Sequence, residues 1–249
     1  MKIDTEGRKE LFRARTGSWN YNLNDETSDE DWKAFVLPTF DDLYDGKIYS
    51  SPTNVSEDLD YSVKDIRFFG KQVYKANITF LELLYSDKVI INPDLDDYTK
   101  ELINRIFGMR DRLVRVNLPK MYEACIGMHK QRIKALGKGS VSTKHLIEKY
   151  GYCTKNGMHS YRYLDFLFRF IAYDDFEKAL KYDESSREMM LSIKNGAFTE
   201  RELTNRLNEC HKTMENKFKS RYKNQIEDLD TMEELNNIIK EIVKANWKG

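Results

Sequence analysis

Short segments with a β-type pattern of apolar and polar residues fill the first third of the chain. Alternation with a period of two, or a short run of β-branched and aromatic residues, predicts a strand. The predicted strands are Leu11–Arg15, Trp32–Leu37, Glu57–Val63 and Lys88–Asn92. Between the last two, apolar residues three or four apart predict a helix within Asp65–Tyr85. Lys47–Glu57 is rich in Ser, Thr, Pro and Asn, which is typical of a loop.

Helical spacing takes over from about Leu95. Apolar residues recur three or four apart in Leu113–Leu136, Val141–Tyr150, Met158–Ala172, Ser185–Lys194, Glu200–Tyr222 and Met232–Trp247. Thr199 followed by Glu202 is a capping box, and Gly151 and Gly196 each follow a helical segment. The sequence therefore predicts an α+β protein, with a mixed α/β domain over residues 1–105 and an all-helical domain over residues 106–249. The last helix could pack on its own domain or on another subunit.

Composition places the chain among globular proteins. Hydrophobic residues make up 40% of its 249 residues, and the mean hydropathy is -0.70. The chain has no apolar run of the roughly 18 residues that a membrane span needs, and no apolar leader follows Met1. Cys125, Cys153 and Cys210 are far apart and form no Cys-x-x-Cys pair, so we expect reduced, buried thiols. We therefore expect a soluble, cytoplasmic protein with no membrane partner.

The formal net charge of zero conceals two opposed regions. Residues 1–65 carry 15 acidic and 8 basic side chains, whereas residues 106–169 carry 13 basic and 4 acidic ones. This asymmetry favours a site that needs both signs, such as a metal-binding carboxylate cluster together with a phosphate-binding wall. Two solvated surfaces of opposite charge, which help the two halves to dock, would give the same pattern.

One polar segment near the N-terminus could carry chemistry. Gly17-Ser18 follows the first predicted strand, and there exposed backbone N–H groups and a hydroxyl can bind phosphate oxygens. Asp29 and Asp31 lie two apart at the start of the next strand, so we expect their carboxylates on one face. Neighbouring carboxylates repel each other unless a divalent cation lies between them. Mg²⁺ commonly combines a few carboxylates with substrate phosphates.

A later predicted strand offers a third carboxylate, because Asp58 and Asp60 repeat the same spacing. This group could deprotonate an attacking hydroxyl or complete a two-metal clamp at phosphorus. An Asp-x-Asp pair alone is more often part of a solvated loop, and a Gly-Ser pair alone indicates even less. The combination of Gly-Ser, Asp-x-Asp and a third Asp on successive strands is what favours a nucleotide site.

This combination resembles the signature of the DNA polymerase β superfamily of nucleotidyltransferases. More narrowly, three segments resemble the RNA-ligase-associated branch of predicted nucleotidyltransferases, which bacteriophages often carry. They are Gly17–Asp31, Asp60–Ser86 and the stretch from Lys155 through His159-Ser160-Tyr161-Arg162 to Gly196. The resemblance spans residues 11–220 or so, and it implies a mixed sheet with helices on one face followed by a helical domain.

The resemblance also implies roles for individual residues. Asp29 and Asp31 would bind Mg²⁺ or Mn²⁺ and act in catalysis together with Asp60, for which Asp58 is the alternative. Gly17 and Ser18 would hold the triphosphate of an NTP. In the family a small or basic residue often follows Gly-Ser, whereas Trp19 follows here, which puts the nucleotide preference and the activity of the site in question.

The function implied is transfer of an NMP from an NTP, such as ATP, to a hydroxyl of RNA, a nucleotide or a protein, as in RNA repair. It would take place in the host cytoplasm if a phage encodes the protein. Lys155, His159 and Arg162, with Arg67 and Lys71 as further candidates, could bind the triphosphate or the acceptor. The alternative is a catalytically weak module that holds nucleotide, RNA or a host protein. The sequence identifies neither the acceptor nor the oligomeric state, and an oligomer is possible.

Several candidate residues also have structural interpretations. His159 and Arg162 lie three apart on one helical face, where Arg162 could pair with Asp165 and His159 could bond to a backbone carbonyl. Asn77 and Glu82 flank an apolar run and could both be structural, with Asn77 as a helix cap. For Asn77 we expect the capping role.

Overall fold

The computed structural model describes residues 3–26, 28–55, 60–140 and 143–247. The chain forms two compact units. The first unit comprises Met1–Asn20, Asn24–Asn117 and Glu227–Gly249, and the second comprises Tyr21–Leu23 and Leu118–Ile226. This division differs from the predicted domains 1–105 and 106–249, because the chain returns to the first unit at Glu227.

A mixed sheet with the strand order β3-β4-β2-β1-β5 forms the basis of the first unit. The strands are β1 (Glu10–Thr16), β2 (Asp31–Val36), β3 (Asn54–Val55), β4 (Asp60–Asp65) and β5 (Val89–Ile91). β2 pairs antiparallel with β1 and parallel with β4, whereas β5 and β3 add antiparallel edges. All four predicted strands are confirmed, with residues 57–59 outside the described residues. The predicted loop at 47–57 contains the two-residue strand β3.

The helices of the first unit lie between and after these strands. They are α1 (Phe40–Tyr44), α2 (Arg67–Tyr74), α3 (Ile78–Leu81), the 3-10 turn η2 (Glu82–Tyr85), α4 (Asp97–Gly108), α5 (Arg110–Leu113) and α13 (Leu229–Ala245). The helix predicted within residues 65–85 is interrupted at Ala76, whose φ is 48°. Asn77 then caps α3 by accepting a hydrogen bond from the Thr79 N–H at 3.0 Å. The capping role predicted for Asn77 is therefore confirmed.

The two faces of the sheet bury different side chains. On one face, Phe12 of β1 and Phe35 of β2 stack with ring centroids 4.9 Å apart. Around them pack Phe69 of α2, Phe80 of α3 and Phe107 of α4. The opposite face carries a separate cluster of Ile3, Trp32, Ala34, Val36 and Val63. Alternation along β2 therefore assigns its odd-numbered residues to the face that the helices cover.

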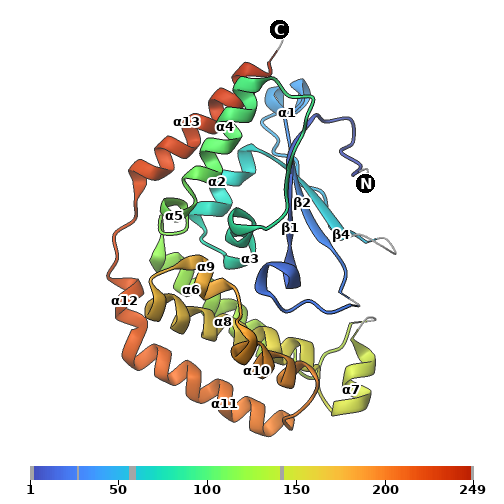
Figure 1. Cartoon of the computed structure of the whole chain (residues 1–249), viewed down its shortest axis with the longest axis vertical. Coiled ribbons are helices and arrows are strands. Elements are labelled where there is room, and N and C mark those ends of the chain that lie inside the picture. Colours follow the sequence, from blue (N-terminus) through green and yellow to red (C-terminus); the bar gives the residue numbers. More distant parts are fainter. Residues whose placement is uncertain (1–2, 27, 56–59, 141–142, 248–249) are drawn as a thin grey trace. The chain divides into compact units, whose positions relative to one another are not determined.

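The last helix, α13, packs on α2, α4 and α5 (Figure 1). It approaches α2 closely at Gly70, where a Cβ atom would lie 2.6 Å from the Asn236 side-chain oxygen. Its buried apolar face consists of Met232, Leu235, Ile238, Ile239 and Ile242. Burial of this face explains why the C-terminal segment belongs to the first unit.

The second unit is helical. Its elements are α6 (Leu118–Lys134), α7 (Lys144–Tyr150), α8 (Thr154–Tyr173), α9 (Phe176–Leu180), α10 (Glu184–Lys194), α11 (Glu200–Thr213), the π-helical turn η3 (Met214–Phe218) and α12 (Lys219–Lys223). α8 contacts α6, α7, α9, α10 and α11, and so it forms the centre of the unit. The predicted capping box of Thr199 and Glu202 begins α11, and Gly151 ends α7 at a φ of 81°.

The fold class is therefore α+β with a mixed sheet, as the sequence predicts. Helices α2, α3 and α4 cover one face of that sheet, in agreement with the predicted arrangement. Among the described residues, no helix combines the length and the apolar character that crossing a membrane requires.

Candidate functional site

The turn at Gly17 follows directly from β1. The 3-10 turn η1 (Gly17–Tyr21) begins with Gly17 at a φ of +81°, a conformation that favours glycine. The Gly17 N–H donates a hydrogen bond to the Glu82 carboxylate at 3.2 Å. On the other side, a Cβ atom at Gly17 would lie 2.3 Å from Oδ2 of Asp31. Two carboxylates therefore converge on Gly17, and its amide is already used within the fold.

Glu82 and Asn20 fix the position of this turn. Glu82 is buried, with 3% of its surface exposed, and its backbone carbonyl accepts a hydrogen bond from the Asn20 side-chain amide at 3.3 Å. The same amide donates to the Arg15 carbonyl at 3.1 Å. Sequence reasoning left Glu82 without a specific role. Its contact with Gly17 spans 65 positions along the chain, which no local pattern could reveal.

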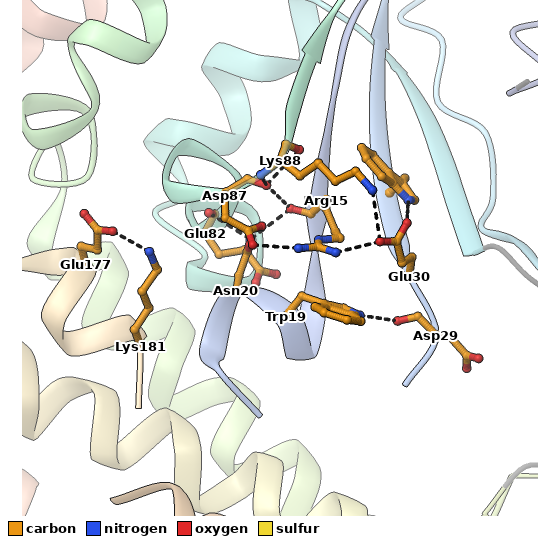
Figure 2. A network of polar contacts seen from close by, with 12 residues as sticks. Arg15, Trp19, Asn20, Asp29, Glu30, Glu82, Asp87, Lys88, Glu177 and Lys181 are labelled. Carbon is orange, nitrogen blue, oxygen red and sulfur yellow. Dashed lines mark hydrogen bonds and ion pairs between the residues drawn. The ribbon is translucent and has the colours of Figure 1, made fainter. Parts of the chain in front are cut away.

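An ionic network centred on Arg15 supports the turn from the side (Figure 2). The buried Arg15 guanidinium donates to Glu30 and to Asp87, both at 2.7 Å, and lies 4.2 Å from the centre of the Trp19 ring. Lys88 also approaches Glu30, at 3.4 Å. Burial raises the pKa of Glu30, but the hydrogen bonds donated by Arg15 and its other partners outweigh burial and lower the pKa overall. Trp19 is therefore held as part of the scaffold of the turn.

Two of the predicted metal ligands lie side by side on the sheet. Asp31 begins β2, Asp60 begins β4, and the parallel register pairs these two residues directly. Paired residues on neighbouring strands lie about 5 Å apart and point to the same face. The structure thus brings together Asp31, Asp60 and Gly17, as the predicted site requires.

Asp29 is placed differently from the prediction. β2 begins only at Asp31, so Asp29 lies before the strand and its side chain is exposed. Its backbone carbonyl accepts a hydrogen bond from the Trp19 indole at 3.2 Å, and Figure 2 shows its carboxylate turned away from that ring. Asp58, the alternative third carboxylate, lies outside the described residues.

The carboxylates of the candidate site can be compared with the ligands that a divalent cation needs. Among the described residues, no group of three or more His, Cys, Asp and Glu side chains is arranged to hold a metal ion. Mg²⁺, however, is often bound by one or two carboxylates, with water and phosphate oxygens completing its six positions. The pair of Asp31 and Asp60 fits that requirement, whereas Asp29 is not brought into the pair.

The remaining predicted binding residues lie on α8 in the second unit. Lys155 is exposed, His159 is partly buried and Arg162 is buried. The Arg162 guanidinium lies 3.7 Å from the centre of the Tyr21 ring, which belongs to the same unit. Burial, followed by the positive charges of Arg162, Arg132 and Lys155, lowers the pKa of His159 well below its usual value. The imidazole is therefore neutral near pH 7.

Sequence reasoning missed two members of this basic cluster. Arg132 of α6 and Lys194 of α10 both act electrostatically on His159. Arg132 also donates to the Asn156 side chain at 3.0 Å, which joins the end of α6 to the first turn of α8. Nδ1 of His159 is buried and has no hydrogen-bond partner in the part of the chain that the structure describes. A neutral imidazole surrounded by cations is a suitable place for an anionic ligand.

Among the other candidates, Arg162 and Arg67 contact other side chains of the fold, and Lys71 is exposed. The Asp165 carboxylate lies 3.9 Å from Arg169, while Arg162 stacks on an aromatic ring. Arg67 donates from Nε to the buried Asp65 at 2.9 Å, so this guanidinium is engaged within the fold. Lys71 lies exposed on α2.

Comparison with known proteins adds no relative to these observations. No family model matches the chain, and no curated protein matches it. The resemblance to nucleotidyltransferases therefore remains a prediction from the residues quoted above.

Proposed function

We propose that the protein is a nucleotidyltransferase that depends on a divalent cation and moves an NMP from an NTP to a hydroxyl acceptor. The observation that carries the proposal is the direct pairing of Asp31 with Asp60, together with the approach of the Asp31 carboxylate to Gly17. Two carboxylates beside a glycine turn suit a cation-bound nucleotide. Few residue types other than Asp at positions 31 and 60 would suit a cation-bound nucleotide.

Each residue of the site has a defined part in this proposal. Asp31 and Asp60 hold the cation, which when bound would neutralise charge at the reacting phosphate. Ser18 offers its hydroxyl and backbone N–H to phosphate oxygens. Asp29 is exposed before the strand and is a weaker candidate than the resemblance implies. Catalysis here needs mainly positioning and electrostatic stabilisation, because the nucleotide supplies the leaving group.

The experiment is incubation with each α-labelled NTP, Mg²⁺ or Mn²⁺, and RNA, nucleotide or protein acceptors. We expect label transfer and pyrophosphate release by the wild type. Asp31→Asn and Asp60→Asn should each lower the rate by a factor on the order of 100 or more. Asp94→Asn, an exposed carboxylate of the same unit, is the matched control and should retain full activity. Equal rates for wild type and Asp31→Asn would refute the assignment.

The basic cluster around His159 favours a second candidate function. Lys155, His159 and Arg162, joined by Arg132 and Lys194, could bind phosphate groups of RNA without any chemistry. In that case RNA retention would fall steeply with salt and would survive Asp31→Asn. Absence of RNA retention at low salt would exclude this candidate.

A further inference from the structure

Lys33 and Lys64 lie further along the same two strands, β2 and β4, that begin with Asp31 and Asp60. Lys33 follows Asp31 by two residues on β2, and Lys64 follows Asp60 by four on β4, with Ser62 directly opposite Lys33. Because alternate residues of a strand share a face, all five side chains lie on the face that also carries Phe35. This is the face that the helices cover around Phe35, but the carboxylate pair and the two lysines all keep part of their surface exposed.

Among the described residues, neither of these two lysines forms a direct ion pair with a carboxylate. The Lys33 ammonium donates to the Thr16 hydroxyl at 3.1 Å, and the Lys64 ammonium donates to the Ser50 hydroxyl at 2.9 Å and lies over the Phe68 ring. The described residues thus supply hydroxyl and aromatic partners, but no carboxylate, to either ammonium. The register places Lys64 two residues beyond the partner of Lys33, on the neighbouring strand. Burial, and after it the charge of Lys33, lowers the pKa of Lys64.

Some other lysines of the first unit lie close to a carboxylate. Lys47, Lys88 and Lys244 have carboxylates at 2.6, 3.4 and 3.7 Å respectively. Lys33 and Lys64 are both less exposed than Lys47 and Lys244, and yet they lack such partners among the described residues. Partly buried charges are normally paired, so this pair points to an anionic partner that the described residues do not provide.

We propose that Lys33 and Lys64, together with the Ser62 hydroxyl, bind the terminal phosphates of the nucleotide triphosphate. This inference rests on the proposed function, in which Asp31 and Asp60 hold the cation. Lys33 lies about 7 Å along β2 from Asp31, and Lys64 lies about 13 Å along β4 from Asp60. The long lysine side chains and an extended triphosphate can together span these separations. The Gly17 amide is already used by Glu82, so these ammonium groups would add positive charge to the phosphate binding that Ser18 offers.

Binding is measured first, without a divalent cation, by calorimetry with tripolyphosphate and with ATP. Lys33→Gln and Lys64→Gln should each weaken tripolyphosphate binding about tenfold, whereas Lys33→Arg keeps the charge and should stay close to wild type. Lys244→Gln is the matched control and should bind like the wild type. Circular dichroism of every variant verifies that the fold is intact. Wild-type affinity in both Gln variants, or no binding of tripolyphosphate by the wild type, would overturn the inference.

Two further measurements separate this inference from the proposed function. If the wild type transfers nucleotides, Lys33→Gln and Lys64→Gln should raise the KM for NTP about tenfold, and an unchanged KM overturns the inference alone. If no NTP is turned over but tripolyphosphate binding is still lost in the Gln variants, the site stands and the proposed function fails. If an RNA oligonucleotide without terminal phosphates displaced tripolyphosphate and ATP did not, the triphosphate site would also be refuted.

Discussion

Replacing Gly17 with alanine tests the geometry of the candidate site directly. The new Cβ atom would have to occupy a position 2.3 Å from Oδ2 of Asp31, and the residue would have to keep a φ of +81°. Both requirements are unfavourable, and they are independent. The variant should therefore be less stable, and its Asp31 carboxylate should be displaced.

The expected loss of unfolding free energy is the sum of a backbone part and a side-chain part. A non-glycine residue in the left-handed region costs about 1–2 kcal/mol. Moving the Asp31 side chain away from its rotamer adds about 0.5–1.5 kcal/mol, because its terminal oxygen can shift more easily than backbone could. Gly17→Ala should thus lower the free energy of unfolding by about 1.5–3.5 kcal/mol. In an Asp31→Ala background only the backbone part remains, since the Asp31 Cβ lies at an ordinary contact distance of 3.5 Å.

Tryptophan fluorescence during urea unfolding is a suitable assay, because Trp19, Trp32 and Trp247 all belong to the first unit. Gly46→Ala is the matched control. Gly46 has a φ of +65°, but a Cβ atom at this position would have nothing within 4 Å, so the variant should show the backbone part alone and no dependence on Asp31. An equal cost of Gly17→Ala with and without the Asp31 carboxylate would refute the reasoning, as would a loss no larger than that of Gly46→Ala.

Two further predictions concern stability. His129 is a buried residue of α6, and burial, above all, lowers its pKa to about 4. Stability should therefore be lost as pH falls from about 6.5 to about 4, by about 3 kcal/mol. His129→Gln should flatten this part of the pH profile of thermal unfolding, and an unchanged profile would contradict the prediction. Asn77→Ala should cost about 1 kcal/mol through loss of the α3 cap, whereas Asn77→Asp should not. A loss of transfer activity at full stability would instead give Asn77 a functional role.

Periodicity predicted most of the elements, because strands and helices bury faces with different spacing. The break in the helix after α2 could not be predicted, since Ala76 adopts its positive φ without any glycine, proline or asparagine signal at that position. The packing of α13 could not be predicted from the sequence either. Its apolar face is visible in the sequence, but the surface that receives it includes Gly70, more than 160 positions earlier.

The candidate site was predicted in part for a similar reason. Asp31 could be found because it lies at the start of a predicted strand, and Asp60 was preferred to Asp58 through the family resemblance. The parallel pairing that brings the two residues together is visible only in the structure. Asp29 lies two residues before Asp31, as the pattern requires, but it is not part of β2. The segment before that strand is fixed by hydrogen bonds from Trp19 to Asp29 and from Arg15 to Glu30. These contacts join side chains from separate segments, and the local sequence contains no sign of them.

The insertion of the second unit has a consequence for synthesis of the protein. The sheet and helices α2 to α5 leave the ribosome first, but α13 follows only after Leu118–Ile226 has been made. At typical elongation rates this interval lasts on the order of 5 to 20 s. During that time the surfaces of α2 and α4 that α13 will cover remain exposed. The helical unit, although encoded later, can be complete first, and the sheet unit closes around its own final helix afterwards.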